Sequence, residues 1–192
     1  MKSFPFVIGL CLLLSTSKLK GQSQTIESDV RTYFNLLSSQ KIEEALDMVH
    51  PQLLAMLGKE TFVAQYRQMF NTPGMSMSMD EFKINSISPV FNHSEHEYAL
   101  VSYAFAMTFK VDLSNDKEGQ LKSLLLSNYQ KQFGKENVKF QQPDSYRIAI
   151  KREMFAVNAK DYSTWKVLDF EEGMKVIIST FIPDAVFTHF KK

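Results

Sequence analysis

The chain has 192 residues, the size of one ordinary domain, and 44% of them are apolar and 22% charged. It contains 7 glycines and 6 prolines, too few for a collagen-like chain or for long flexible linkers. The 22 basic and 21 acidic residues give a formal net charge of +1. Because this balance creates no strong field of one sign, we expect no nucleic acid as a partner.

Residues 1–21 have the layout of a secretory signal peptide. Lys2 provides a positive start, residues 4–14 form an apolar run, and small and polar residues lead to Gly21, where we expect cleavage. The run is much shorter than the roughly 20 apolar residues of a transmembrane helix. We therefore expect an exported protein, periplasmic or secreted, with no stable membrane anchor.

The chain has one cysteine, Cys11, and it lies inside this apolar run. A lipoprotein signal would place a small residue before the cysteine, whereas Leu10 precedes Cys11 here, so we expect no lipidation. After cleavage the chain would contain no cysteine and no disulfide. Residues 22–192 should therefore form a single domain that is held together by its hydrophobic core.

The first third of this domain has helical periodicity. Apolar residues recur on one face of a helix over 25–38, and helical spacing continues over 41–49. Pro51 breaks or restarts the helix, and a further helix is predicted over 59–70. The inward positions predicted for the first and last of these helices are Ile26, Val30, Tyr33, Phe34, Leu37, Phe62, Val63, Tyr66, Met69 and Phe70.

After Gly74 the apolar period changes to two, which is typical of strands. The pattern predicts strands over 75–87, 98–111, 138–140, 146–157 and 164–170, a helix over 116–133 and a helical tail over 173–190. The apolar phase slips between Ile84 and Ile87 and again at 151–153, and each slip predicts a β-bulge. Since bulges bend strands, the sheet should be strongly curved.

This order predicts an α+β fold, with N-terminal helices packed on a curved antiparallel sheet and an extra helix between strands. Segments 45–51, 62–70, 101–111 and 165–169 together resemble the nuclear transport factor 2-like superfamily in element order and texture. The resemblance implies a cone-shaped fold whose members include isomerases, dehydratases and carrier-type binders. It carries no signature motif, so it assigns no catalytic residue.

The strand over 98–111 has two unlike faces. One face carries Val101, Tyr103, Phe105, Met107, Phe109 and Val111, and the other carries the smaller set Leu100, Ser102, Ala104, Ala106 and Thr108. A solvated sheet face is normally polar, whereas this one is half apolar. We expect it to be covered either by the 116–133 helix or by a second copy of the chain, which would make a homodimer.

Five residues are candidates for lining a ligand cavity: Tyr66, Tyr103, Phe105, Trp165 and His50. Large rings with polar tips suit a mostly apolar pocket with a few polar groups, but the same rings could simply fill a packed core. His50 could act as a general base at the mouth of the cone. Alternatively, it could interact with the carbonyl end of the preceding helix.

Two clusters suggest metal ligands and are better explained otherwise. The segment 93–97 contains two histidines and two glutamates, but it falls in a predicted polar hairpin turn with no defined ligand geometry. Met75, Met77 and Met79 share one strand face, where thioether sulfurs could bind monovalent copper but more often only pack. We therefore predict neither a metal site nor a cofactor.

No phosphate-binding loop, nucleophile elbow, HExxH or CxxC motif occurs after the leader. The carboxylates expected nearest a pocket wall are Asp47 and Asp169. The sequence favours a non-catalytic module that binds a small apolar ligand or a protein partner. The alternative is an isomerase or hydratase that uses a buried carboxylate or histidine in the cone, with catalytic residues unassigned.

Overall fold

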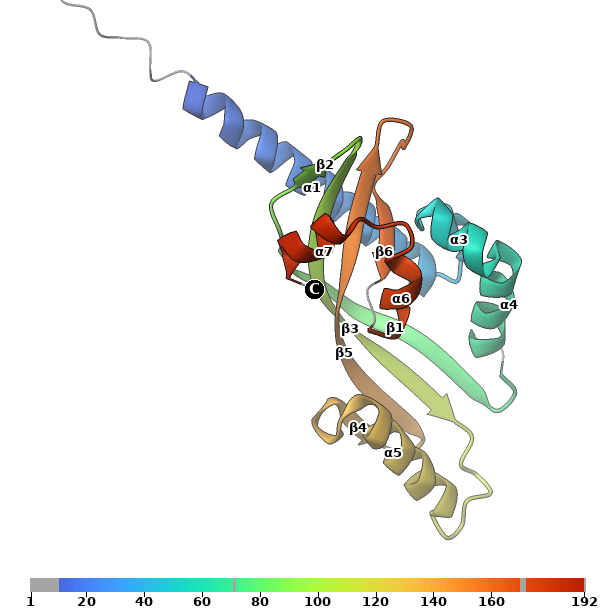
Figure 1. The fold of residues 1–192 in the computed structure, drawn as a ribbon. Coiled ribbons are helices and arrows are strands. Elements are labelled where there is room, and N and C mark those ends of the chain that lie inside the picture. The colour runs from blue at the N-terminus through green and yellow to red at the C-terminus, as the bar shows by residue number, and fades with distance from the viewer. Residues whose placement is uncertain (1–10, 71, 170–171, 192) are drawn as a thin grey trace, which may run out of the picture.

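The computed structural model describes residues 11–70, 72–169 and 172–191. It has the predicted α+β fold. Four helices come first, α1 (Cys11–Ser38), α2 (Ile42–Leu46), α3 (Pro51–Leu57) and α4 (Lys59–Phe70). They pack beside an antiparallel sheet that is curled but not closed (Figure 1).

The sheet has six strands, with β1, β3, β5 and β4 as neighbours in that order, β2 paired to β3 and β6 paired to β5. Helix α5 (Gln120–Phe133) lies between β3 and β4 in the chain. A short 3-10 turn, helix α6 (Lys175–Ile178) and helix α7 (Asp184–Phe190) follow β6. The strands are β1 (Met75–Ile87), β2 (Phe91–His93), β3 (His96–Val111), β4 (Val138–Gln141), β5 (Ser145–Ala159) and β6 (Lys166–Asp169).

The predicted helical faces are confirmed where they matter most. On α1 the side chains of Ile26, Val30, Phe34 and Leu37 are buried, at the spacing of one helix face. Pro51 does not break a helix but begins one, because it occupies the first position of α3, where its missing N–H is not needed. Gly58, at φ +82, then allows the sharp turn into α4.

The predicted bulge in β1 is confirmed, and the same strand contains a second register shift. The register between β1 and β3 shifts between Ile84 and Ser86, and it also shifts between Asp80 and Lys83, around Glu81 at φ +54. The bulge predicted at 151–153 is wrong, since β3 and β5 pair without a shift from His96 to Lys110.

The apolar pattern of β5 shifts by one residue in the sequence because residues 154–157 of this strand are buried on both faces. Met154, Phe155, Ala156 and Val157 are all buried in succession. Phe155 packs against Phe187 and Phe190 of α7, with ring centroids 5.8 Å away in each case. A strand covered on both sides loses its alternation of apolar and polar residues, although its backbone stays regular.

We call the sheet face that carries Val101, Tyr103 and Phe105 the inner face and the opposite one the outer face. Helix α5 packs on the inner face, where Tyr129 stacks on Phe109 with ring centroids 5.3 Å apart. The expectation that this helix covers the small residues of β3 is therefore wrong.

The outer face of β3 carries small residues for a different reason. Arg147 of β5 reaches across β3 to Asp80 of β1, with Nη1 3.0 Å from Oδ1, and it also pairs with Glu81. On the middle strand β3, Ala106 stands opposite Asp80 of β1, and Thr108 stands opposite Arg147 of β5. Small side chains on the middle strand leave room for these long charged ones to meet. A homodimer through this face stays a prediction.

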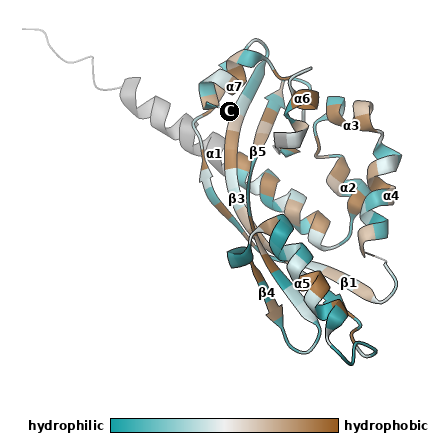
Figure 2. Ribbon diagram, turned by 60° about the horizontal axis from the view of Figure 1, so that its bottom comes forward, coloured by the Kyte–Doolittle hydropathy of each residue, from teal (hydrophilic) through white to brown (hydrophobic). Residues whose placement is uncertain are grey.

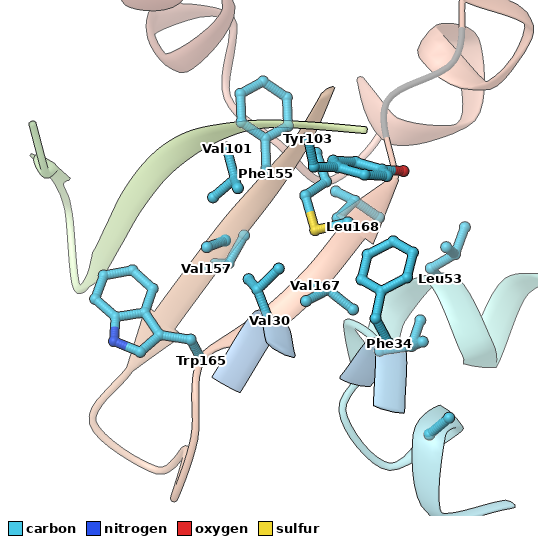
Figure 3. Close-up of a cluster of buried hydrophobic side chains, with 14 of the residues drawn as sticks. Val30, Phe34, Leu53, Val101, Tyr103, Phe155, Val157, Trp165, Val167 and Leu168 are labelled. Carbon is cyan, nitrogen blue, oxygen red and sulfur yellow. The ribbon is translucent and has the colours of Figure 1, made fainter. Parts of the chain in front are cut away.

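A large hydrophobic cluster joins the helices to the inner face. Figure 3 shows part of it, with Phe34 and Leu53 near Tyr103 and with Trp165 at the opposite end. A smaller cluster of Val138, Ile148 and Ile150 lies under α5.

The predicted leader, residues 1–21, lies partly outside the described residues, and from Cys11 onward its backbone forms the first part of α1. Cleavage and export therefore stay predictions. Among the described residues, none of the helices combines the length and the apolar character needed to cross a membrane.

Candidate functional site

A cavity of about 460 Å³ lies between the short helices and the inner face of the sheet. Figure 2 shows the elements around it, with α2, α3 and α4 on one side and the sheet and α6 on the other. Its walls are mostly apolar and are formed by Leu46, Val49, Leu53, Phe62, Met69, Met154, Val167 and Met174, with the polar residues Tyr33, Gln65, Tyr66 and Asp169. A concave apolar space with a few convergent polar groups is the usual form of a small-molecule site.

The wall of this cavity is held to the sheet by backbone pairing. Val49 forms an isolated parallel bridge with Val167, in which the Val167 N–H donates to the Met48 carbonyl over 2.8 Å and the His50 N–H donates to the Val167 carbonyl over 3.0 Å. The segment between α2 and α3 therefore extends the sheet beyond β6. This pairing fixes where α3 and α4 begin, and so it fixes the width of the cavity.

Two ion pairs hold α4 against α2. The Lys59 ammonium lies 2.5 Å from the Asp47 carboxylate, and Arg67 pairs with Glu43. All four side chains are exposed, so each pair stabilises the structure only modestly. Asp47, a candidate pocket carboxylate from the sequence, is therefore a surface ion-pair partner and does not line the cavity.

Asp169, the other candidate carboxylate, is the polar centre of the cavity. The Tyr103 hydroxyl donates to its Oδ1 over 2.8 Å, and the Arg152 Nη1 donates to its Oδ2 over 3.4 Å. Tyr103 and Arg152 face each other on β3 and β5, and Asp169 of β6 stands opposite Met154, two residues further along β5. Two strands thus direct a donor to each oxygen of one carboxylate.

Three tyrosine hydroxyls surround this carboxylate, and all three keep their protons at neutral pH. Burial, and then the charge of Asp169, raises the pKa of Tyr103. Burial is also the largest cause that raises the pKa of Tyr33, and the neighbouring Tyr66 and Asp169 raise it further. The pKa of Tyr66 is raised by burial and then by the charge of Asp169. The Tyr33 and Tyr66 hydroxyls lie close enough for each to shift the pKa of the other. These groups therefore act as hydrogen-bond donors.

A second cavity of about 240 Å³ lies further along the inner face, toward α5. It includes Phe105, Met107 and Ile150 in its walls, and Arg152 contributes a charged group. The two cavities share five wall residues, which separate them: Tyr33, Tyr66, Met69, Met154 and Asp169.

The structure brings three of the five predicted site residues together. Tyr66 borders both cavities, and Tyr103 and Phe105 border the smaller one. Trp165 is buried in the core and borders neither cavity, and its backbone N–H donates to the Asp29 carboxylate over 2.9 Å. Sequence reasoning did not select Tyr33 or Arg152, although Tyr33 was predicted to face inward and Arg152 pairs with Tyr103 across the strands.

His50, the fifth predicted site residue, borders neither cavity. Its ring is 3% exposed and stacks on Phe181 with centroids 5.1 Å apart, and its Nδ1 has no hydrogen-bond partner among the described residues. The expected contact with a preceding helix is not made, because α2 ends at Leu46 and His50 instead precedes α3. Burial, and then the nearby His96, lowers the pKa of His50 to about 4.

The two clusters considered as metal ligands take part in ordinary structure. His93 and His96 face each other across the β2–β3 turn, and His96 borders a broad open hollow of about 800 Å³ with Tyr162. Met75, Met77 and Met79 stand opposite Val111, Phe109 and Met107 on the inner face. Within the described residues, no group of three or more His, Cys, Asp or Glu side chains is arranged to hold a metal ion.

No protein-family model matches this chain, and no curated protein matches it either. The resemblance to the nuclear transport factor 2-like superfamily therefore stays a prediction.

Proposed function

We propose that the protein is a binding module that holds a small apolar molecule in the 460 Å³ cavity. One observation carries this proposal: mostly apolar walls surround a polar cluster of Asp169, Tyr33 and Tyr66. The apolar walls would supply affinity by removing hydrocarbon surface from water, at about 25 cal/mol per Å². The polar cluster would orient the molecule.

The arrangement of donors favours binding over catalysis. Each oxygen of Asp169 already accepts a hydrogen bond, from Tyr103 and from Arg152, so the carboxylate already serves to join β6 to β3 and β5. The other ionisable candidate, His50, is buried away from both cavities. The position of Asp169 in the walls of both cavities supports the alternative, an isomerase or hydratase that uses this carboxylate as its base.

The test is binding of the neutral apolar dye N-phenyl-1-naphthylamine, whose fluorescence rises in apolar surroundings. Gln65 is exposed at the cavity wall, so Gln65→Trp places an indole in the space that the dye would occupy. Gln68→Trp is the matched control, because Gln68 is exposed on the same helix and lines neither cavity.

We expect saturable binding to the wild type, at least tenfold weaker binding to Gln65→Trp, and affinity within twofold of wild type for Gln68→Trp. The absence of binding, or an equal loss in the two variants, would contradict the proposal. Turnover of the bound molecule that disappears in Asp169→Asn while dye binding persists would favour the catalytic alternative.

A further inference from the structure

The two cavities are neighbours and share five wall residues. These are Tyr33 from α1, Tyr66 and Met69 from α4, and Met154 and Asp169 from the sheet. We take the side chains of these residues to form the partition, so that the two spaces can join without movement of the backbone. What divides them is therefore a set of rotamers, which can change without unfolding of any element.

The interactions that hold this wall closed are weak. The two tyrosines meet through neutral hydroxyls, and an interaction between neutral hydroxyls contributes little net stability. Tyr33 and Tyr66 are both only partly buried. The two methionines are unbranched and adapt readily to new neighbours, and Met69 is 40% exposed.

The space beyond this wall is suited to hydrocarbon. Its walls include Met79, Phe105, Met107, Phe133 and Ile150. Its charged groups are already paired, since Arg152 donates to Asp169. Neither cavity therefore offers an unpaired charge to the ionised end of a ligand, and a molecule without charge would avoid the cost of desolvating one.

We propose that the Tyr33–Tyr66 pair is a gate between two chambers, and that the bound molecule is an elongated, uncharged aliphatic chain that opens this gate and occupies both. This inference rests on the proposed function and adds a ligand class to it. A short molecule would occupy the larger chamber alone, with the gate closed. A long one would displace the tyrosine hydroxyls and extend toward Met107.

The methionine methyl groups report which chamber is filled. Met174 borders only the larger chamber, and Met79 and Met107 border only the smaller one. In NMR spectra of protein labelled at the methionine methyls, we expect 1-hexanol to give nuclear Overhauser contacts with Met174 but not with Met79 or Met107. We expect 1-dodecanol to give contacts with methyls on both sides of the gate.

A matched pair of variants tests the gate itself. Tyr66→Phe removes the hydroxyl that meets the hydroxyl of Tyr33, and loss of this neutral polar contact should tighten 1-dodecanol binding about fivefold. Binding of 1-hexanol should stay within twofold of wild type. Tyr98→Phe makes the same chemical change at a buried position that borders neither cavity, and it should alter neither affinity.

The charge of the ligand is tested with dodecanoate, which has the same chain length as 1-dodecanol and should bind at least tenfold more weakly. Equal or tighter binding of dodecanoate would overturn the uncharged class. Contacts of 1-dodecanol with Met174 alone, together with an unchanged Tyr66→Phe variant, would overturn the gate but leave the proposed function standing. If neither alcohol contacts Met174, the gate and the proposed function both fail.

Discussion

The same helices cover two unlike regions of the sheet's inner face. Toward the start of the domain, Ile26 and Val30 of α1 are fully buried and pack in a solid core with Trp165. One turn later, Tyr33 of the same helix is only partly buried and borders both cavities. Three residues along one helix therefore separate a packed interior from a hollow one.

The difference between the regions lies in the side chains that line them. The solid region is built from branched aliphatic residues and rings, which fill space at the density of an organic crystal. The hollow region is lined by tyrosines, methionines and a carboxylate with two donors. Polar tips need partners and so cannot be packed freely, which favours a space between them. Stability should accordingly depend on the first region and ligand binding on the second.

The largest expected effect is on the solid region. Ile26 of α1 is fully buried in this region, and Ile26→Ala should lower the free energy of unfolding by about 3–5 kcal/mol in urea denaturation. Ile150→Ala is the matched substitution beside the smaller cavity, where the side chain already borders empty space. It should cost about 1–2 kcal/mol. Equal costs would mean that the two regions are packed alike.

The next effect is a pH dependence that comes from His50. Its pKa of about 4 in the folded chain lies below the ordinary value of 6.5, so the unfolded chain binds more protons between these two values. Stability should be complete above pH 6.5 and fall by roughly 2–3 kcal/mol as the pH drops to 4. The groups that face His50 are Phe181, Tyr162 and His96.

Two histidine variants isolate this contribution in urea unfolding at several pH values. His50→Leu should reduce the loss of stability between pH 6.5 and 4, because the proton-binding ring is gone. His93→Leu, in the β2–β3 turn, should keep the wild-type slope. A slope unchanged in His50→Leu would show that carboxylates and not this histidine cause the acid sensitivity.

A smaller effect is expected at the polar cluster of the hollow region. Tyr103→Phe removes the donor to Asp169 Oδ1 and should cost about 1–2 kcal/mol of unfolding free energy. Tyr98 is also a buried residue, but its hydroxyl makes no side-chain hydrogen bond within the described residues, so Tyr98→Phe should cost less than about 0.5 kcal/mol. Similar values for the two variants would remove the energetic basis of the cluster.

The smallest effect belongs to the outer face. Arg147→Gln breaks the pairs with Asp80 and Glu81 and should cost less than about 1 kcal/mol, with a difference that shrinks as salt is added. Dye binding should be unchanged, because this face lies across the sheet from the cavities. A change in dye affinity would show that the two faces are coupled.

The sequence predicted the elements well and the site in part. The helical face of α1, the long strand β3 and the bulge near Ile84 were all visible as apolar periods. The β5 slip was misread because burial on both faces by α7 and the inner core imitates a change of phase. Likewise, nothing in a local pattern shows which sheet face α5 will cover.

For the site, the sequence could indicate only which types of residue line a cavity, and not which individual residues do so. Tyr66 and Tyr103 were chosen as rings with polar tips, and they do border cavities. His50 and Trp165 were chosen on the same grounds but lie in the core. The difference depends on contacts between residues far apart in the sequence, such as Val49 with Val167 and Tyr103 with Asp169, which no spacing rule contains.

The central claim, that the space under α2–α4 accepts an apolar molecule, is tested most directly by methionine methyl NMR with 1-hexanol. The account predicts ligand contacts with the methyls of Met69, Met154 and Met174, and none with Met48 or Met56, which border neither cavity. Contacts confined to the exposed Met56, or no contacts at any methyl while 1-hexanol is present in excess, would contradict it.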